Sequence, residues 1–358
     1  MSSETEAPDH EDIRHESLYH SDGDWVIFAP ISAGGHMIFR VHKFLLCHHS
    51  PIFSDLLTLP QGAEEMREMY DGVPALHLTD PAKDLAFLLD VLYDPSALPY
   101  EALDPYTPIL VRGILSLATK YFISSLRRRI VQQLQKDWPT TLNEWDTLEG
   151  HIVAWSPPDP ENPMNIWLDG SFPEPASAIS ISRRFDIPQL LPAAFYHLSR
   201  LTVEQDWDHY RDSDFTDQFY HDMIEHKGRS ARWRLLGRDD LICLLKGKDT
   251  IKKHLEVFEN SFSSGNKRCR EKDSDCSNKI RGIVKRIIRI SEESRDPLAT
   301  FKEYGKIPEF GHSEDPEYED QVCFSCSRNM KRRMGEWRCD FWDNISDVFN
   351  LPTSRKAR

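Results

Sequence analysis

The chain has 358 residues and a formal net charge of −14, with 39% hydrophobic and 28% charged residues. This length and composition predict two packed units joined by polar connectors. The acidic balance argues against nonspecific binding of nucleic acid by the whole chain, and no apolar run is long enough to span a bilayer.

Three short strands are predicted in the N-terminal third of the chain. They follow an acidic, polar stretch over residues 1–20, which is not a signal peptide and is expected to be a disordered tail. The glycine pair at 34–35 provides a turn that tolerates positive φ between the first two strands. The strands are expected over residues 24–28, 37–42 and 75–78.

Helices are predicted to fill the rest of this region. Ser50 and Asp80 each precede a proline, and their side chains are expected to cap the helices that follow. Apolar residues then recur at helical spacing. The predicted helices begin near residues 43, 51 and 81 and continue over 114–121 and 126–134. The aromatic residues Trp25, Phe28, Phe44 and Phe53 are expected to lie in the core.

The second half of the chain is predicted to be mostly helical. Prolines are dense between residues 155 and 175 and exclude a regular helix there. The basic stretch from Lys267 to Arg289 contains isoleucines at helical spacing, which favours an amphipathic helix with solvated charges over a phosphate-binding face. The expected divisions are a tail over 1–20, a first domain over 21–138, a Pro-rich connector over 139–175, a helical extension over 176–260, a polar linker over 261–278 and a C-terminal helical segment over 279–358.

Several motifs in the N-terminal third resemble the BTB (POZ) family. They are Asp-Trp-Val-Ile-Phe at 24–28, Phe-Arg-Val-His-Lys-Phe-Leu-Leu at 39–46, Ser-Pro-Ile-Phe at 50–53 and the leucine-rich segment 84–93. Three further segments, 68–72, 117–121 and 126–129, resemble the large BTB families of mushroom-forming fungi. The resemblance implies an α+β fold, in which a short three-stranded sheet packs with a helix cluster and a mostly α-helical C-terminal region follows.

The resemblance also implies residues that contact partners. In BTB relatives an aspartate in the first strand and a basic residue after the histidine line a charged pocket near the dimer seam. Asp24 and Lys43 match these positions, and an ordinary ion pair is the alternative. Relatives that recruit cullin scaffolds carry a hydrophobic-x-Glu segment after the third helix. Met66-Arg67-Glu68 has this form, although so short a pattern is common by chance. The N-terminal helix that crosses the dimer in many animal members has no counterpart here, so monomer and dimer both remain open.

The seven cysteines are odd in number and irregularly spaced, which favours a reducing compartment, cytoplasmic or nuclear. Cys323 and Cys326 have the spacing of two corners of a tetrahedral zinc site, and a helical hairpin would bring Cys276 or Cys269 opposite them. The incomplete ligand set favours the alternative, in which these are ordinary thiols at the start of the last helix.

The sequence contains no recognisable nucleophile motif, glycine-rich phosphate loop or metalloprotease pattern, so a non-enzymatic function without a catalytic cofactor is expected. We interpret the chain as a protein-interaction module, specifically an adaptor between a cullin-type ubiquitin ligase scaffold and a client. The alternative is a self-associating scaffold or transcription-associated regulator without a ligase link, which would pair through the exposed edge of the first strand. The expected partners are proteins, not nucleic acid or membrane.

Overall fold

The computed structural model describes residues 12–58, 68–155, 168–212, 229–262, 276–306 and 322–352. The chain divides into two compact units. The first comprises Met1–Ala102 and Thr107–Leu134, and the second comprises Leu103–Tyr106 and Gln135–Arg358. Among the described helices, none has both the length and the apolar character that crossing a bilayer requires.

The first unit contains a mixed five-stranded sheet with the strand order β1-β3-β2-β5-β4. Its hairpin of β2 and β3 is antiparallel, and Gly34 and Gly35 turn the chain with φ values of 96° and 77°. Strand β1 pairs with β3 in parallel, and β5 pairs with β2 in parallel. The strands are β1 (Ile13–Tyr19), β2 (Trp25–Pro30), β3 (His36–Val41), β4 (Met69–Tyr70) and β5 (Val73–His77).

The three predicted strands correspond to β2, β3 and β5, and two further strands join them. The expectation of a disordered tail through residue 20 was wrong for β1, which is held by side-chain contacts that its polar sequence does not reveal. Leu18 is buried, the His15 ring stacks on Phe39 at 5.2 Å, and the Tyr19 hydroxyl donates to the Asp71 carboxylate at 2.5 Å. Because β3 and β5 pair with its two sides, β2 is a central strand and has no exposed edge, contrary to expectation.

Helices of the first unit pack around the sheet, with α3 against β1 and β2. The predicted Ser50 cap is confirmed, since its buried hydroxyl accepts from the Phe53 N–H at 3.0 Å and donates to the Tyr121 carbonyl at 2.6 Å. The predicted Asp80 cap was wrong, because the Asp80 carboxylate instead accepts from the Lys120 ammonium and the Tyr121 hydroxyl. These helices are α1 (Lys43–His49), α2 (Pro51–Thr58), α3 (Ala82–Tyr93), α4 (Thr107–Leu110), α5 (Arg112–Lys120) and α6 (Ser124–Lys136).

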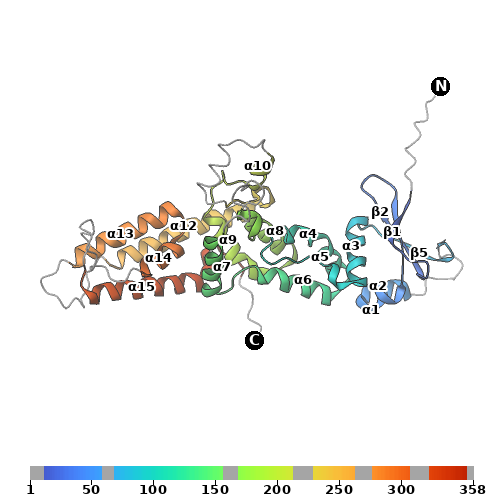
Figure 1. Ribbon diagram of the computed structural model, residues 1–358, viewed down its shortest axis with the longest axis horizontal. Coiled ribbons are helices and arrows are strands. Elements are labelled where there is room, and N and C mark those ends of the chain that lie inside the picture. Colours follow the sequence, from blue (N-terminus) through green and yellow to red (C-terminus); the bar gives the residue numbers. More distant parts are fainter. Residues whose placement is uncertain are drawn as a thin grey trace, which may run out of the picture. The chain divides into compact units, whose positions relative to one another are not determined.

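The second unit is helical. Within it α12, α13, α14 and α15 pack against one another as a bundle, coloured from yellow to red in Figure 1. The apolar stripe of α13 is buried and most of its basic residues are exposed, which confirms the predicted amphipathic helix. The helices are α7 (Leu142–Ala154), α8 (Pro175–Phe185), α9 (Leu191–Ser199), α10 (Trp207–Asp212), α12 (Arg238–Asn260), α13 (Cys276–Ser294), α14 (Pro297–Lys306), α15 (Phe324–Asp343) and α16 (Ile345–Val348).

Helix α7 lies inside the segment 139–175 that was predicted to be a connector. It begins at a capping box, in which the Thr141 hydroxyl accepts from the Glu144 N–H and the Glu144 carboxylate accepts from the Thr141 N–H. Its Trp145 side chain is only 1% exposed. The prolines that led to the connector prediction are concentrated after this helix, so they end it without preventing it.

Candidate functional site

An exposed aromatic side chain marks helix α1 of the first unit. The Phe44 ring is 76% exposed and stacks on the ring of His48, one turn later, at 5.6 Å. Leu46 lies on the opposite side of the helix and is fully buried. The prediction that Phe44 belongs to the core was therefore wrong. Residues two positions apart in a helix do not face the same way, so the burial of Leu46 turns Phe44 outward.

The structure brings Asp24 and Lys43 together, but not through their charged groups. The Asp24 carboxylate accepts a hydrogen bond from the backbone N–H of Lys43 at 2.6 Å, at the first turn of α1. The Lys43 ammonium donates to the carbonyl of Leu57 at 3.0 Å and lies 5.4 Å from the centre of the Trp25 ring. Asp24 thus stabilises the start of a helix, and within the described residues no ion pair joins it to Lys43.

Of the two residues expected to contact a cullin, Met66 lies outside the described residues. Glu68 is exposed, immediately before β4, and its carboxylate pairs with the His77 ring at 2.9 Å. Among the described helices, α2 is the last one before it, whereas the resemblance implied a position after the third helix. An exposed pair of this kind contributes at most about 1 kcal/mol, so Glu68 can exchange His77 for a partner protein at little cost.

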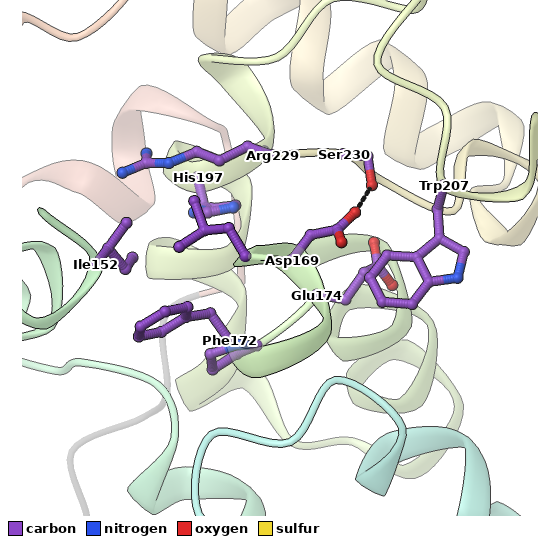
Figure 2. A pocket seen from close by; sticks show the side chains of 10 residues that line it. Ile152, Asp169, Phe172, Glu174, His197, Trp207, Arg229 and Ser230 are labelled. Atoms are coloured by element: carbon purple, nitrogen blue, oxygen red, sulfur yellow. Dashed lines mark hydrogen bonds between the residues drawn. The ribbon is translucent and has the colours of Figure 1, made fainter. Parts of the chain in front are cut away.

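A small pocket lies in the second unit and contains several ionisable side chains (Figure 2). Its volume is about 290 Å³, including open solvent. The Asp169 carboxylate accepts from Arg211 at 2.9 Å and from the Ser230 hydroxyl, and Glu174 accepts from the backbone N–H groups of Ala176 and Ser177 at the start of α8. These groups are already engaged in holding helices and loops together. The lining residues are Ile152, Leu168, Asp169, Phe172, Pro173, Glu174, His197, Trp207, Arg229 and Ser230.

Beside this pocket, the guanidinium of Arg200 is buried between two carboxylates. It donates to Glu149 at 2.9 Å and to Asp296 at 2.7 Å, and its side chain is 3% exposed. Burial would raise the pKa of Glu149, but the charges of Arg200 and Arg229 overcome that effect and lower it. Burial, together with the same two arginines, lowers the pKa of His197 well below its ordinary value. The shifts favour a charged Glu149 and a neutral His197, as a structural network requires.

Sequence reasoning missed this network because its members are scattered. Glu149, Arg200 and Asp296 are separated by 51 and 96 residues, and each has the appearance of a surface charge in its own segment. The one local signal is the helical spacing in α7, which places Trp145 and Glu149 four residues apart on the same face.

Three of the four predicted metal ligands come together in the second unit. The Sγ atoms of Cys276, Cys323 and Cys326 all lie within 4.8 Å of one another. Cys269 lies outside the described residues. Cys339, also on α15, is exposed and is not part of this cluster.

A known family model matches part of the first unit. Residues 30–137 match the family model of the BTB/POZ domain. No curated protein matches the chain. The match covers most of the first unit and ends at residue 137, one residue after the end of α6.

Proposed function

Because residues 30–137 are a BTB/POZ domain, and therefore a protein-interaction module, we propose that this chain is an adaptor joining a cullin-type ubiquitin ligase scaffold to a client protein. The BTB/POZ domain would hold the scaffold, and the second, helical unit would hold the client. Two compact units in one chain suit this division of tasks.

The observation that carries the proposal is the exposed ring of Phe44 on α1. A phenylalanine that is 76% exposed leaves most of its apolar surface in water, and burying such a side chain against a partner stabilises the complex by about 1.5–3 kcal/mol. Aromatic anchors of this kind commonly dominate protein interfaces. Its neighbour His48 is exposed as well, so a partner can reach both rings from the same side of the helix.

Glu68 supplies the charge of the proposed contact. Its side chain is 60% exposed, and its present partner His77 is 47% exposed. A charged residue at the rim of an interface mainly affects the rate of association and the choice of partner. We therefore propose that burial of Phe44 supplies most of the binding affinity, and that the Met66/Glu68 segment determines which scaffold is bound.

The test is a pulldown of purified full-length protein against the N-terminal regions of the host's cullins. The variants are Phe44→Ala, a Met66/Glu68 double-alanine variant and a matched control, Val153→Ala, whose side chain is 83% exposed in the second unit. We expect capture by the wild type and by Val153→Ala, and at least about tenfold weaker capture by Phe44→Ala. Absence of capture by a folded wild-type sample would refute the proposal.

The alternative is a self-associating scaffold without a ligase link, and the edge strand β1 favours it. One side of β1 pairs with β3 and the other side ends the sheet, and Ile13 at its start is 52% exposed. Unpaired strand edges are ready templates for a second copy. Light scattering after size exclusion decides this point: the alternative predicts a dimer that Ile13→Lys converts to monomer.

A further inference from the structure

Three cysteine thiols meet at one end of the helical bundle in the second unit. Cys276 is the first residue of α13, Cys323 is the N-cap of α15, and Cys326 lies in the first turn of α15. Their Sγ atoms lie within 4.8 Å of one another, although Cys276 and Cys323 are 47 residues apart in the sequence. Two segments that are distant in the chain therefore converge on this cluster.

Two helices begin at the cluster. Cys276 opens α13, with 19 residues, and Cys323 and Cys326 lie at the start of α15, with 20 residues. The backbone N–H of Cys323 donates to the Cys276 sulfur at 3.4 Å, so the two helix starts are in direct contact at the thiols.

Basic residues predominate toward the start of both helices. The first fourteen residues of α13, 276–289, include five basic residues and no acidic residue. The first ten residues of α15, 324–333, include four basic residues and no acidic residue. Positive charge along these helices suits ligands that bind a metal as anions. The basic residues are Lys279, Arg281, Lys285, Arg286 and Arg289 on α13, and Arg328, Lys331, Arg332 and Arg333 on α15.

The separation of the sulfur atoms suits a single metal ion. A Zn–S bond of about 2.3 Å places two sulfurs of a tetrahedral site about 3.8 Å apart. The observed limit of 4.8 Å requires each pair to approach by no more than about 1 Å. Cys276 and Cys326 are almost fully buried, and Cys323 is half-buried, so an ion would lie at the edge of the core.

From this geometry we propose that Cys276, Cys323 and Cys326 bind one zinc ion through their thiolates. The ion joins the N-terminus of α13 to the N-terminus of α15 and so closes the end of the bundle. Its fourth position is taken by a donor other than these three thiols, water being the simplest. Binding releases the protons of any thiols that are still protonated.

Two other uses of the thiols compete with this one. Buried cysteines also pack simply as small apolar residues, and Cys276 and Cys326 do belong to the buried cluster of the bundle, with Ile280 and Met330 among its members. A pair spaced as Cys323 and Cys326 are can also form a disulfide through loss of two electrons to an oxidant. Cys323 also packs against this cluster, but apolar packing alone does not require the three sulfur atoms to lie within 4.8 Å of one another.

The test measures metal on full-length protein purified under reducing conditions with zinc present. The variants are Cys323→Ser, Cys276→Ser and a matched control, Cys339→Ser, which changes an exposed cysteine of α15 outside the cluster. Elemental analysis gives the zinc content per chain. Titration of the zinc-free protein with Co²⁺ gives sulfur-to-cobalt charge-transfer bands that report thiolate ligands directly, and circular dichroism verifies that each variant is folded.

We expect about one zinc per chain in the wild type and in Cys339→Ser. Substitution of residues that hydrogen-bond to a metal ligand lowers metal affinity by about 10–100-fold, so loss of the ligand Cys323 itself should lower the affinity for zinc by about 100-fold or more. A wild type with neither bound zinc nor a cobalt–thiolate band would overturn the proposal. So would a Cys323→Ser variant that binds zinc as tightly as the wild type, or a Cys323–Cys326 disulfide that persists under the reducing conditions.

Discussion

Substituting Gly247 by alanine should destabilise the second unit, although glycine is a poor residue in a helix. Gly247 lies within α12, where alanine would ordinarily stabilise by about 1 kcal/mol. A Cβ at this position, however, would lie 1.9 Å from Cδ1 and 2.1 Å from Cε1 of Phe349. Ordinary contacts begin at 3.4 Å, so the ring must move by more than 1 Å.

The Phe349 ring has little space into which to move. It is fully buried and stacks on Phe195 at 5.6 Å. Overpacking of a core costs about 1–3 kcal/mol, and loss of a whole phenylalanine side chain from a core costs about 3–5 kcal/mol. Subtracting about 1 kcal/mol of helix propensity leaves about 0–2 kcal/mol if the core adjusts and about 2–4 kcal/mol if the ring is expelled, so we expect Gly247→Ala to lower the free energy of unfolding by about 2 kcal/mol.

Urea denaturation followed by tryptophan fluorescence measures this change, because only Trp25 of the nine tryptophans lies in the first unit. A loss of about 2 kcal/mol moves the midpoint down by roughly 1 M urea. The matched control is Gly335→Ala on α15, where a Cβ would meet nothing within 4 Å, and there the midpoint should rise. If Gly247→Ala is as stable as the wild type, the packing argument is refuted.

Three further outcomes are expected. Arg200→Met should lower the free energy of unfolding by about 3–5 kcal/mol, since it removes the guanidinium from between the buried carboxylates of Asp296 and Glu149, of which Glu149 keeps its pair with Arg229. A loss below 1 kcal/mol in the same denaturation assay would contradict this. Because the pKa of His197 is lowered in the folded protein, this histidine binds a proton more readily in the unfolded chain than in the folded one. The free energy of unfolding should therefore fall as the pH drops below about 6.5, by up to about 1.4 kcal/mol per pH unit. Urea titrations across about pH 5–8 should show a smaller pH dependence for His197→Asn than for the wild type. Thr141→Ala removes the N-cap of α7 and should lower the free energy of unfolding by about 1 kcal/mol, measured by thermal or urea unfolding. An unchanged unfolding midpoint would show that the cap does not contribute to stability.

Local patterns predicted the elements of the first unit well. The strands β2, β3 and β5 were predicted because apolar residues and a glycine turn lie close together in the sequence. The Ser50 cap was predicted because a proline follows it. Asp80 has the same local signature, yet its carboxylate is taken by Lys120 and Tyr121, which lie 40 and 41 residues later. A short-range pattern cannot distinguish these two cases.

The candidate sites were predicted less completely, for a related reason. The spacing of Cys323 and Cys326 indicated half of a thiol cluster and left Cys276 and Cys269 as candidates to complete it; within the described residues, the packing of α13 against α15 brings Cys276 to the pair. Phe44 lies in an apolar run, and its exposure depends on which side of α1 packs against α2 and α3. Strand β1 is polar, and it is held by partners such as Asp71 that lie more than fifty residues away.

The arrangement of the second unit also affects how the chain folds during synthesis. Phe341 packs against Tyr196, and Phe349 packs against Phe195, so helix α9 is completed by residues that leave the ribosome much later. The elements of the BTB/POZ domain, by contrast, are all made before residue 137. Because domains generally fold in the order in which they emerge, the first unit can fold and meet a partner while the second is still exposed. Chaperones are thus expected to bind nascent chains over the second unit and to leave them when α15 and α16 have been made.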